Sequence, residues 1–494
     1  METIIQVCFL AYTALLFVVM WLSSRKSAGN DAFFRGQRKS PWPVVAYGMI
    51  GASLSGVTFM SVPGGVYYGQ FTYMPLVFGY VLGYIVIALV LLPLYYRLNL
   101  TSIYTYLNQR FGAASEKTGA AFFLISRLMG SALRMYLVVF VLYEFVFRSW
   151  GIPFWVPAVI FIAIILLYTF RGGVKTVVWT DTLQTTFLLL AAIVTVVAIL
   201  KQLDISLPQL LRRSSEAGYT RIFETDPTAS KYYWKQIISG MFITITMTGL
   251  DQDMMQKNLS CKSLRAAQKN VLTSSLLFII VNIIFLCLGA ALIAYCQSSG
   301  FPLPVNEAGA VVGDKIFPSV AFHISTFTAV VFVLGMVAAG YSSADGTLTA
   351  LTTTFCYNFL GFDKAEKDTN SRFTIHNSQF STLAIRRLVH IGFALLYLLV
   401  IIAFRPFHNQ SLIDTLFDIA GFTYGPLLGL YTFGLFTRRS VRDRWVPVIA
   451  ILSPAVCYLL KLYMPQWTGY HFGFEILLLN GLITFLCLLL IRKK

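Results

Sequence analysis

The chain has 494 residues, of which 57% are hydrophobic and only 12% are charged, and its formal net charge is +17. A soluble protein carries about 25% charged residues, so this composition excludes an ordinary soluble fold. The basic balance is typical of the Lys and Arg that membrane proteins gather in cytoplasmic loops, and it does not call for nucleic acid as a partner.

Apolar stretches of about 20 residues recur along the whole chain and predict transmembrane helices in a lipid bilayer. The first stretch, Ile4 to Leu22, has no basic segment before it and no small-residue cleavage site after it, so we expect a retained helix. The span at 319–359 is too long for one crossing and should bend or lie partly outside. We predict 13 spans, at 3–23, 43–69, 74–97, 119–147, 152–170, 177–201, 232–254, 272–297, 319–359, 383–404, 411–436, 445–463 and 471–491.

Loop charges predict the orientation of these spans. If the N-terminus lies outside, most of the basic loop residues fall in inner loops, which gives an N-out and C-in topology. The exception is the long outer loop at 202–231, which is mixed in charge and could hold a short helix. The polar inner loop at 361–382 is expected to be mobile. No nucleotide-binding loop, further soluble domain or obligate protein partner is indicated.

Two polar segments interrupt the apolar pattern, one in each half of the chain. Gly51–Thr58 holds two glycines, two serines and a threonine, which lets a helix open and expose carbonyl groups. Ala338–Gly346 holds adjacent hydroxyls and a carboxylate, and an ionised Asp at mid-helix costs roughly 2.5–3.5 kcal/mol. Interrupted segments in both halves indicate a transporter binding site, although small residues in the first segment are equally typical of close helix packing.

The second segment also suggests a cation site. Ala339, Ser342 and Ser343 lie three or four residues apart, so that a carbonyl and two hydroxyls share one helix face. With two carbonyls from the first segment they would form a cage of oxygens, which a hard cation prefers. Such a cage has no titratable group, so it suits sodium and cannot carry a proton. Serine can instead bond back to its own helix, which weakens this evidence.

Two arginines share a face of the span at 119–147. Arg127 is close enough to the inner surface to extend its side chain towards water. Arg134 is too deep for that and requires an anionic partner, either Asp345 or Asp181 in a structural ion pair or an acidic substrate.

A further acidic pair ends the span at 232–254. Asp251 and Asp253 lie next to Lys257 at the inner boundary, and we expect them to be interfacial and solvated. No catalytic constellation is evident anywhere in the chain, which argues against an enzyme.

Several motifs resemble those of the sodium/solute symporter family, which includes sodium-coupled sugar, proline, choline and sialic acid carriers. The resemblance covers nearly the whole chain, and the form at 55–64 is closest to the sialic acid carriers. The motifs are Phe33-Phe34-Arg35-Gly36, Ser55-Gly56-Val57-Thr58-Phe59-Met60-Ser61-Val62-Pro63-Gly64, Thr101–Leu107, Gly172–Asp181, Gln252–Lys257 and the double serine.

This resemblance implies an all-α, multi-pass plasma-membrane protein (the inner membrane if the cell is bacterial) with a LeuT-like core of two inverted five-helix repeats. Residues 1–42 would form a leading helix and basic inner loop, 43–231 the first repeat and outer loop, 232–436 the second repeat, and 437–494 two trailing helices. The expected function is sodium-coupled import of a small polar solute, such as a carboxylate of the sialic acid type, by alternating access.

The resemblance also implies site residues. The main sodium site maps onto Gly51, Leu54, Ala339, Ser342 and Ser343. A second sodium site in some members maps onto Asp181 and onto Asp345, where those members carry a hydroxyl, so its usual form is altered here. Expected solute-binding residues are Ser53, Ser55, Thr58, Tyr73, Arg134, Thr246 and Thr248. The rival interpretation is a membrane-embedded sensor, or a member of the fold that does not transport.

Overall fold

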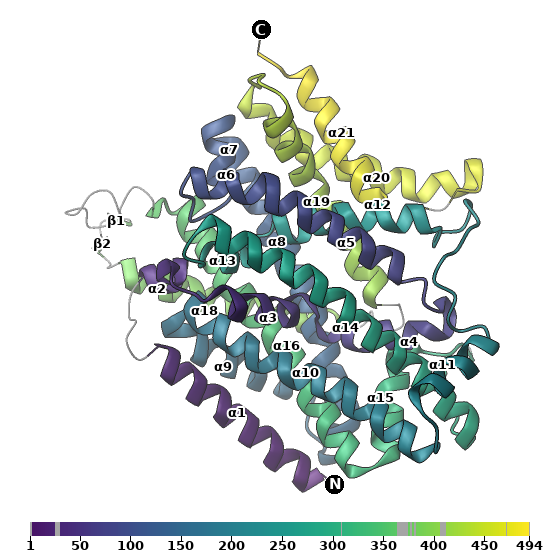
Figure 1. Ribbon diagram of the computed structural model, residues 1–494. Coiled ribbons are helices and arrows are strands. Elements are labelled where there is room, and N and C mark those ends of the chain that lie inside the picture. The colour runs from purple at the N-terminus through teal and green to yellow at the C-terminus, as the bar shows by residue number, and fades with distance from the viewer. Residues whose placement is uncertain are drawn as a thin grey trace.

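The computed structural model describes residues 2–24, 30–307, 309–362, 374–375, 378–379, 382–405, 412–470 and 472–493. Within these ranges the chain is almost entirely helical (Figure 1). The exceptions are two short strands, β1 (Thr374–Ile375) and β2 (Ser378–Gln379), which pair in antiparallel register.

Nine of the described helices are long and apolar enough to cross a membrane, and the bent pair α3 and α4 brings the number to as many as ten. Their outward faces carry exposed apolar side chains such as Leu10 and Leu399, as lipid contact requires. The long helices are α1 (Glu2–Ser24), α5 (Met74–Val86) continued by η2 (Ile87–Leu91) and α6 (Leu92–Arg97), α8 (Ala113–Leu142) continued by η3 (Tyr143–Phe147), α10 (Val174–Gln202), α14 (Leu264–Ser299), α16 (Thr326–Thr354) continued by η6 (Phe355–Phe359), α18 (Thr382–Ala403), α19 (Leu412–Phe436) and α20 (Val446–Thr468).

The remaining predicted spans are helical but shorter or divided. The spans at 152–170 and 471–491 correspond to α9 (Trp155–Gly172) and α21 (Ile476–Leu490). The span at 232–254 is divided into α12 (Tyr233–Thr244), η5 (Ile245–Gly249) and α13 (Gln252–Leu259).

Short helices occupy the connections. The loop at 202–231 holds α11 (Leu207–Glu216), as its sequence suggested. The overlong span at 319–359 divides at Ser325, between α15 (Gly313–Ile324) and α16. Most of the loop at 361–382 lies outside the described residues. The other connecting helices are α2 (Asn30–Arg35), η1 (Gly36–Arg38), α7 (Thr105–Arg110), η4 (Arg148–Trp150) and η8 (Asp443–Trp445).

The first polar segment is a true break. Helix α3 (Trp42–Ser53) ends and α4 (Gly56–Gly69) begins at an angle of 62°, with Leu54 and Ser55 in extended conformations between them. The second segment is not a break, because Ala338–Gly346 lies inside the uninterrupted helix α16. Its polar side chains bond to neighbouring helices while its backbone stays helical. The second break lies instead between η5 and α13, where Asp251 caps α13 by accepting the amide of Met254 (3.1 Å).

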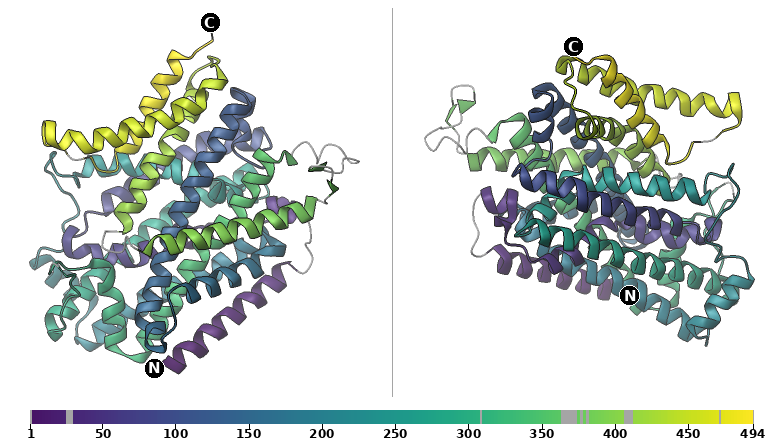
Figure 2. Two further views of the ribbon diagram at one scale, coloured as in Figure 1. Left: turned by 180° about the vertical axis from the view of Figure 1, so that it is seen from behind. Right: turned by 45° about the horizontal axis from the view of Figure 1, so that its top comes forward.

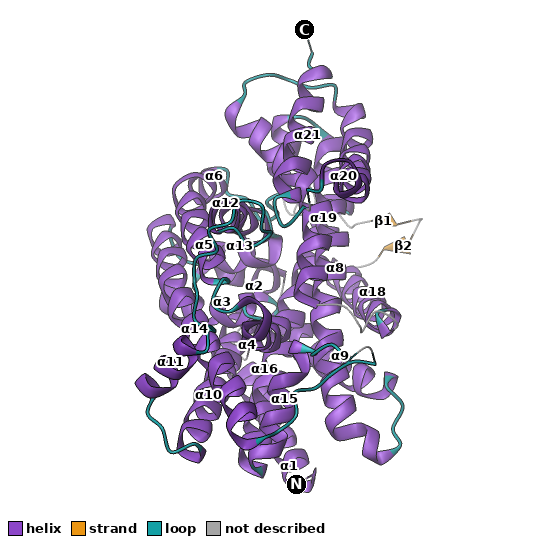
Figure 3. Cartoon of the chain, turned by 90° about the vertical axis from the view of Figure 1, so that its right-hand side faces the viewer, coloured by secondary structure: helices purple, strands orange, loops and turns teal. Residues whose placement is uncertain are grey.

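The leading and trailing helices flank the bundle. Helix α1 lies along one edge and α20 and α21 lie at the opposite edge, as the views in Figures 1, 2 and 3 agree. Helix α1 packs on α9, α10 and α16, and α20 packs on α19 and α21. The two broken segments lie in the body between these edges.

The core is one large apolar cluster plus a small one around α2. The small cluster packs α2 against the end of α16 and the start of α18, and the guanidinium of Arg386 lies 4.3 Å from the centre of the Phe33 ring. The side-chain amide of Gln256 also donates to the carbonyl of Phe34 (2.7 Å). The cluster consists of Phe33, Phe34, Cys356, Tyr357, Phe362 and Ile385.

Candidate functional site

The break between α3 and α4 packs directly on α10. The amide of Gly51 donates to the Oγ1 atom of Thr185 (3.0 Å), and that hydroxyl donates to the carbonyl of Asp181 (2.7 Å). A Cβ atom at position 51 would lie 2.2 Å from the same Oγ1 atom, so only glycine fits there. The carbonyl end of α3 is therefore held against the polar face of α10.

Helix α16 reaches the same face of α10 from the other side. The hydroxyl of Ser342 donates to Oδ1 of Asp181 (2.6 Å), and both side chains are almost completely buried. The carbonyl of Ser343 accepts from the hydroxyl of Ser131 on α8 (3.0 Å). Leu54 and Ala339 are fully buried as well. The tertiary structure thus brings both sequence segments that were predicted to hold sodium to one stretch of α10: Gly51 through Thr185 and the main-chain carbonyl of Asp181, and Ser342 through the Asp181 carboxylate.

Asp345 lies one turn after Ser342 and points to a different set of donors. Its Oδ2 atom accepts from the hydroxyl of Tyr168 on α9 (2.9 Å) and from that of Thr180 on α10 (3.3 Å). Thr180 is the neighbour of Asp181, so the two acids predicted to act together do belong to one buried polar cluster. Nothing in the sequence pattern pointed to Tyr168, because a single tyrosine in an apolar span usually serves packing.

Asp251 and Asp253 are not solvated, which corrects the sequence interpretation. Their side chains are 0% and 2% exposed, and both pair with Arg127, through a direct contact of Asp253 and at 3.5 Å from Asp251. The hydroxyl of Tyr424 also donates to Asp251 (2.6 Å). The break before α13 turns these carboxylates into the bundle, so Arg127, only 4% exposed, does not extend towards water.

Arg134 does not pair with Asp345 or Asp181, which corrects the predicted structural ion pair. Asp181 pairs instead with Lys257, whose Nζ atom lies 2.9 Å from Oδ2 of Asp181. The Arg134 side chain is 7% exposed and its Nε atom has no hydrogen-bond partner among the described residues. A small cavity of about 10 Å³ adjoins Arg134, Met247 and Tyr424, which is room for about one water molecule. Among the residues that the structure describes, Arg134 is therefore a buried cation that forms no ion pair.

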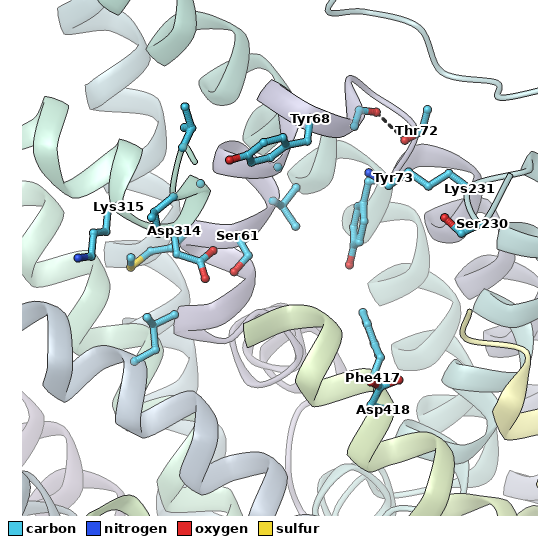
Figure 4. Close-up of a pocket in the computed structure, with 18 of the residues that line it drawn as sticks. Ser61, Tyr68, Thr72, Tyr73, Ser230, Lys231, Asp314, Lys315, Phe417 and Asp418 are labelled. Carbon is cyan, nitrogen blue, oxygen red and sulfur yellow. Dashed lines mark hydrogen bonds between the residues drawn. The ribbon is translucent and has the colours of Figure 1, made fainter. Parts of the chain in front are cut away.

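A much larger cavity of about 1000 Å³ opens on the side of the predicted outer loops (Figure 4). Ser61 and Tyr68 of α4 face this space, as do Tyr73, which precedes α5, and Phe417 of α19; Asp314 at the start of α15 lies on its wall. We call this cavity the vestibule. Leu416, next to Phe417 in the chain, lines the small cavity at Arg134, so α19 borders both spaces.

One ion pair stands at the rim of the vestibule. The Nζ atom of Lys461 on α20 lies 2.5 Å from Oδ1 of Asp418 on α19. Both residues line the vestibule, and their side chains are 29% and 41% exposed. The pair ties the wall of the cavity to a trailing helix.

The structure divides the predicted solute-binding residues. Tyr73 lines the vestibule and Arg134 lines the small cavity. Ser53 and Ser55 lie at the α3/α4 break, and the hydroxyl of Ser55 has no partner among the described residues. Thr58 is half-buried on α4.

Two further predicted residues, Thr246 and Thr248, belong to η5. The hydroxyl of Thr246 donates back to the carbonyls of Phe242 (2.9 Å) and Ile243 (3.1 Å), which engages it within its own helix. Met247, between the two threonines, lines the small cavity beside Arg134. The seven predicted solute-binding residues therefore do not surround one open cavity of solute size in this structure.

Comparison with known proteins agrees with the geometry. Residues 33–441 match the model of the sodium:solute symporter family. A sodium/sialic acid symporter of Proteus mirabilis is 24% identical over 469 residues, which cover 93% of this chain and 89% of that protein. The human sodium/iodide cotransporter is 26% identical and aligns with 84% of this chain and 63% of its own length.

A solved structure shows the same fold. The substrate-bound, outward-open state of a Na⁺-coupled sialic acid symporter superposes with a TM-score of 0.81 at 21% identity, and the alignment covers 99% of both chains.

Proposed function

This chain belongs to the sodium:solute symporter family, and from that premise we propose that it imports a small carboxylated solute, such as a sialic acid, together with sodium. Membership makes it a sodium-coupled symporter with multiple membrane spans, and not an enzyme. The observation that carries the solute class is the buried guanidinium of Arg134, which forms no ion pair with any acid in the described part of the chain.

We propose that the main sodium site consists of the carbonyls of Gly51, Leu54 and Ala339 and the hydroxyls of Ser342 and Ser343. The contact of Asp181 with Ser342 supports this proposal, because it fixes the Ser342 oxygen and adds a negative charge near the ion. Five neutral oxygens suit a monovalent hard cation. The backbone is extended at Leu54 and Ser55, and of these two carbonyls the one of Ser55 already accepts the amide of Phe59 (2.9 Å), which leaves that of Leu54 as the proposed ligand.

Asp181 and Asp345 lie on either side of a second proposed cation site, next to the first. Both are buried, and Thr180 and Ser342 tie them into one cluster between α10 and α16. Two buried carboxylates at membrane depth favour a positive charge between them.

Solute would bind between the vestibule and Arg134. A carboxylate that reaches the guanidinium gains charge-assisted hydrogen bonds and relieves a cation that is otherwise costly to bury. The cavity beside Arg134 has room for only about one water molecule, so α19 and η5 must shift for solute to reach it. Tyr73, Ser53, Ser55, Thr58, Thr246 and Thr248 remain the proposed remainder of the solute site.

The two ends of the molecule differ as expected for one state of an alternating-access cycle. The vestibule is open on one side, whereas the apolar cluster of α2 with Tyr357 and Phe362 packs at the inner ends of the predicted spans. With the proposed N-out and C-in orientation, this is an outward-facing state. The repeats at 43–231 and 232–436 each begin with a broken segment, which supports an inverted-repeat core with a leading helix in 1–42 and trailing helices in 437–494.

Uptake by proteoliposomes tests this proposal. Radiolabelled N-acetylneuraminate should accumulate under an inward sodium gradient and not under an equal potassium gradient. Unlabelled N-acetylneuraminate should compete, whereas iodide should not. Accumulation that ignores the sodium gradient would contradict the coupling, and competition by iodide alone would contradict the solute class.

A further inference from the structure

Lys257 is a cation buried beside the main sodium site. It lies on α13 and its side chain is 2% exposed. Its Nζ atom lies 2.9 Å from Oδ2 of Asp181 on α10 and 3.4 Å from Oδ1 of Asp253, one turn earlier on its own helix. A buried ammonium is tolerated only with such partners, because it has lost its hydration.

Asp181 connects this ammonium to the sodium site. One of its carboxylate oxygens accepts from Ser342 (2.6 Å) and the other faces Lys257. The ammonium is thus one carboxylate away from a proposed sodium ligand. Whatever charge Asp181 presents to the sodium site depends on Lys257.

Gly346 leaves the room that this ammonium needs. A Cβ atom at position 346 would lie 2.8 Å from Nζ of Lys257 and 2.3 Å from Oδ1 of Asp253. The reason for glycine here is space, because the residue lies within the regular helix α16. Any side chain at 346, including a hydroxyl that could bind a cation, would compete with the ammonium for the same volume.

Asp345 is satisfied without a cation. It accepts from Tyr168, from Thr180 and from its neighbouring amide at Gly346 (2.5 Å). It forms no ion pair with any residue in the described part of the chain. Of the two acids of the second proposed site, only Asp181 therefore carries a positive partner, and that partner is Lys257.

We propose that the ammonium of Lys257 is the permanent occupant of the second cation site, so that this symporter binds one sodium ion per cycle. The inference rests on the proposed function and names the cation of its second site. It also gives the electrical consequence: one sodium with one monoanionic solute moves no net charge, whereas two sodium ions would move one positive charge.

A purely structural role for Lys257 predicts something different. A lysine that only ties α13 to α10 would lower stability when removed and would leave the number of bound sodium ions unchanged. The ion count therefore separates the two roles, and a melting curve alone does not.

Binding of ²²Na⁺ to the purified full chain measures that count. At saturation the wild-type protein should bind one ion, and Ser342→Ala with Ser343→Ala should bind none. Lys257→Met should bind two, because Asp181 loses its ammonium. The matched control Asp181→Asn with Lys257→Met removes both charges and should return to one. Two ions on the wild type, or one on folded Lys257→Met, would overturn the proposal.

Transport gives a second measurement that needs no variant. In wild-type proteoliposomes, the solute and sodium gradients at which net N-acetylneuraminate flux is zero should be the same at every membrane potential. A shift with potential would mean at least two sodium ions and would overturn the single-ion cycle while leaving sodium-coupled uptake intact. Failure of any sodium-driven uptake would instead contradict the proposed function.

Discussion

The hydroxyl of Ser342 donates a hydrogen bond of 2.6 Å to Oδ1 of Asp181, and neither side chain is more than 1% exposed. This bond joins helices α16 and α10 at the centre of the bundle. It places a negative charge against one of the two hydroxyls proposed to bind sodium, while the other, that of Ser343, contacts the neutral Ser131. The two serines should therefore respond differently to substitution.

Removal of either hydroxyl should weaken sodium binding. We expect Ser342→Ala and Ser343→Ala each to raise the half-saturating sodium concentration at least tenfold, about 1.4 kcal/mol, and the loss should be larger for Ser342. Sodium-dependent uptake in proteoliposomes measures this. Ser453→Ala is the matched control, because Ser453 is equally buried but bonds only to Asn480 in the trailing helices. Unchanged sodium dependence in both serine variants would refute the main site.

Replacement of Arg134 should remove solute binding without unfolding the protein. Because Arg134 has no ion pair to lose among the described residues, Arg134→Gln should keep the wild-type melting temperature within a few degrees. Its heat of binding with N-acetylneuraminate should disappear, and binding should not return when Asp181 or Asp345 is also neutralised. Retained binding in Arg134→Gln would show that another residue holds the carboxylate.

Replacement of Arg127 should do the opposite. Arg127→Gln leaves the buried carboxylates of Asp251 and Asp253 without their shared cation, and loss of one partner from a buried ion pair typically costs 3–5 kcal/mol. We expect a clear fall in the melting temperature in detergent, partly restored when Asp253→Asn is added. A stable Arg127→Gln protein would mean that the network contributes little to folding.

The pair of Asp418 and Lys461 should restrain closure of the vestibule. If α19 swings inward over the solute, this ion pair to α20 must break. Since the pair is partly exposed, it is worth at most about 1 kcal/mol, so Asp418→Asn should raise apparent solute affinity by up to about fivefold. The exchange variant, Asp418→Lys with Lys461→Asp, should restore wild-type affinity. An affinity that falls in Asp418→Asn would contradict a restraint on closure and indicate a direct solute contact.

Much of the architecture was readable from the sequence. Long apolar runs predicted the helices because backbone groups in lipid must be satisfied within the segment. The cluster of glycine and serine at 51–58 predicted the break that the structure shows between α3 and α4. The predicted interruption at the second polar segment was wrong, because α16 continues through Ala338–Gly346. The second break lies instead at Leu250 and Asp251.

The charges inside the bundle were decided by tertiary structure alone. The sequence placed Asp181, Asp345 and Arg134 at membrane depth without pairing them correctly. It wrongly expected Asp251 and Asp253 to be solvated. Pairing depends on which helices meet and how far each is rotated. Arg127 pairs with Asp251 and Asp253, and Lys257 pairs with Asp181, whereas Arg134 forms no ion pair in the described part of the chain. A hydrophobic pattern shows that a segment is buried, but an ion pair forms over a few ångströms between residues that lie far apart in the sequence. Only the folded chain brings the two charged groups of each pair within that distance.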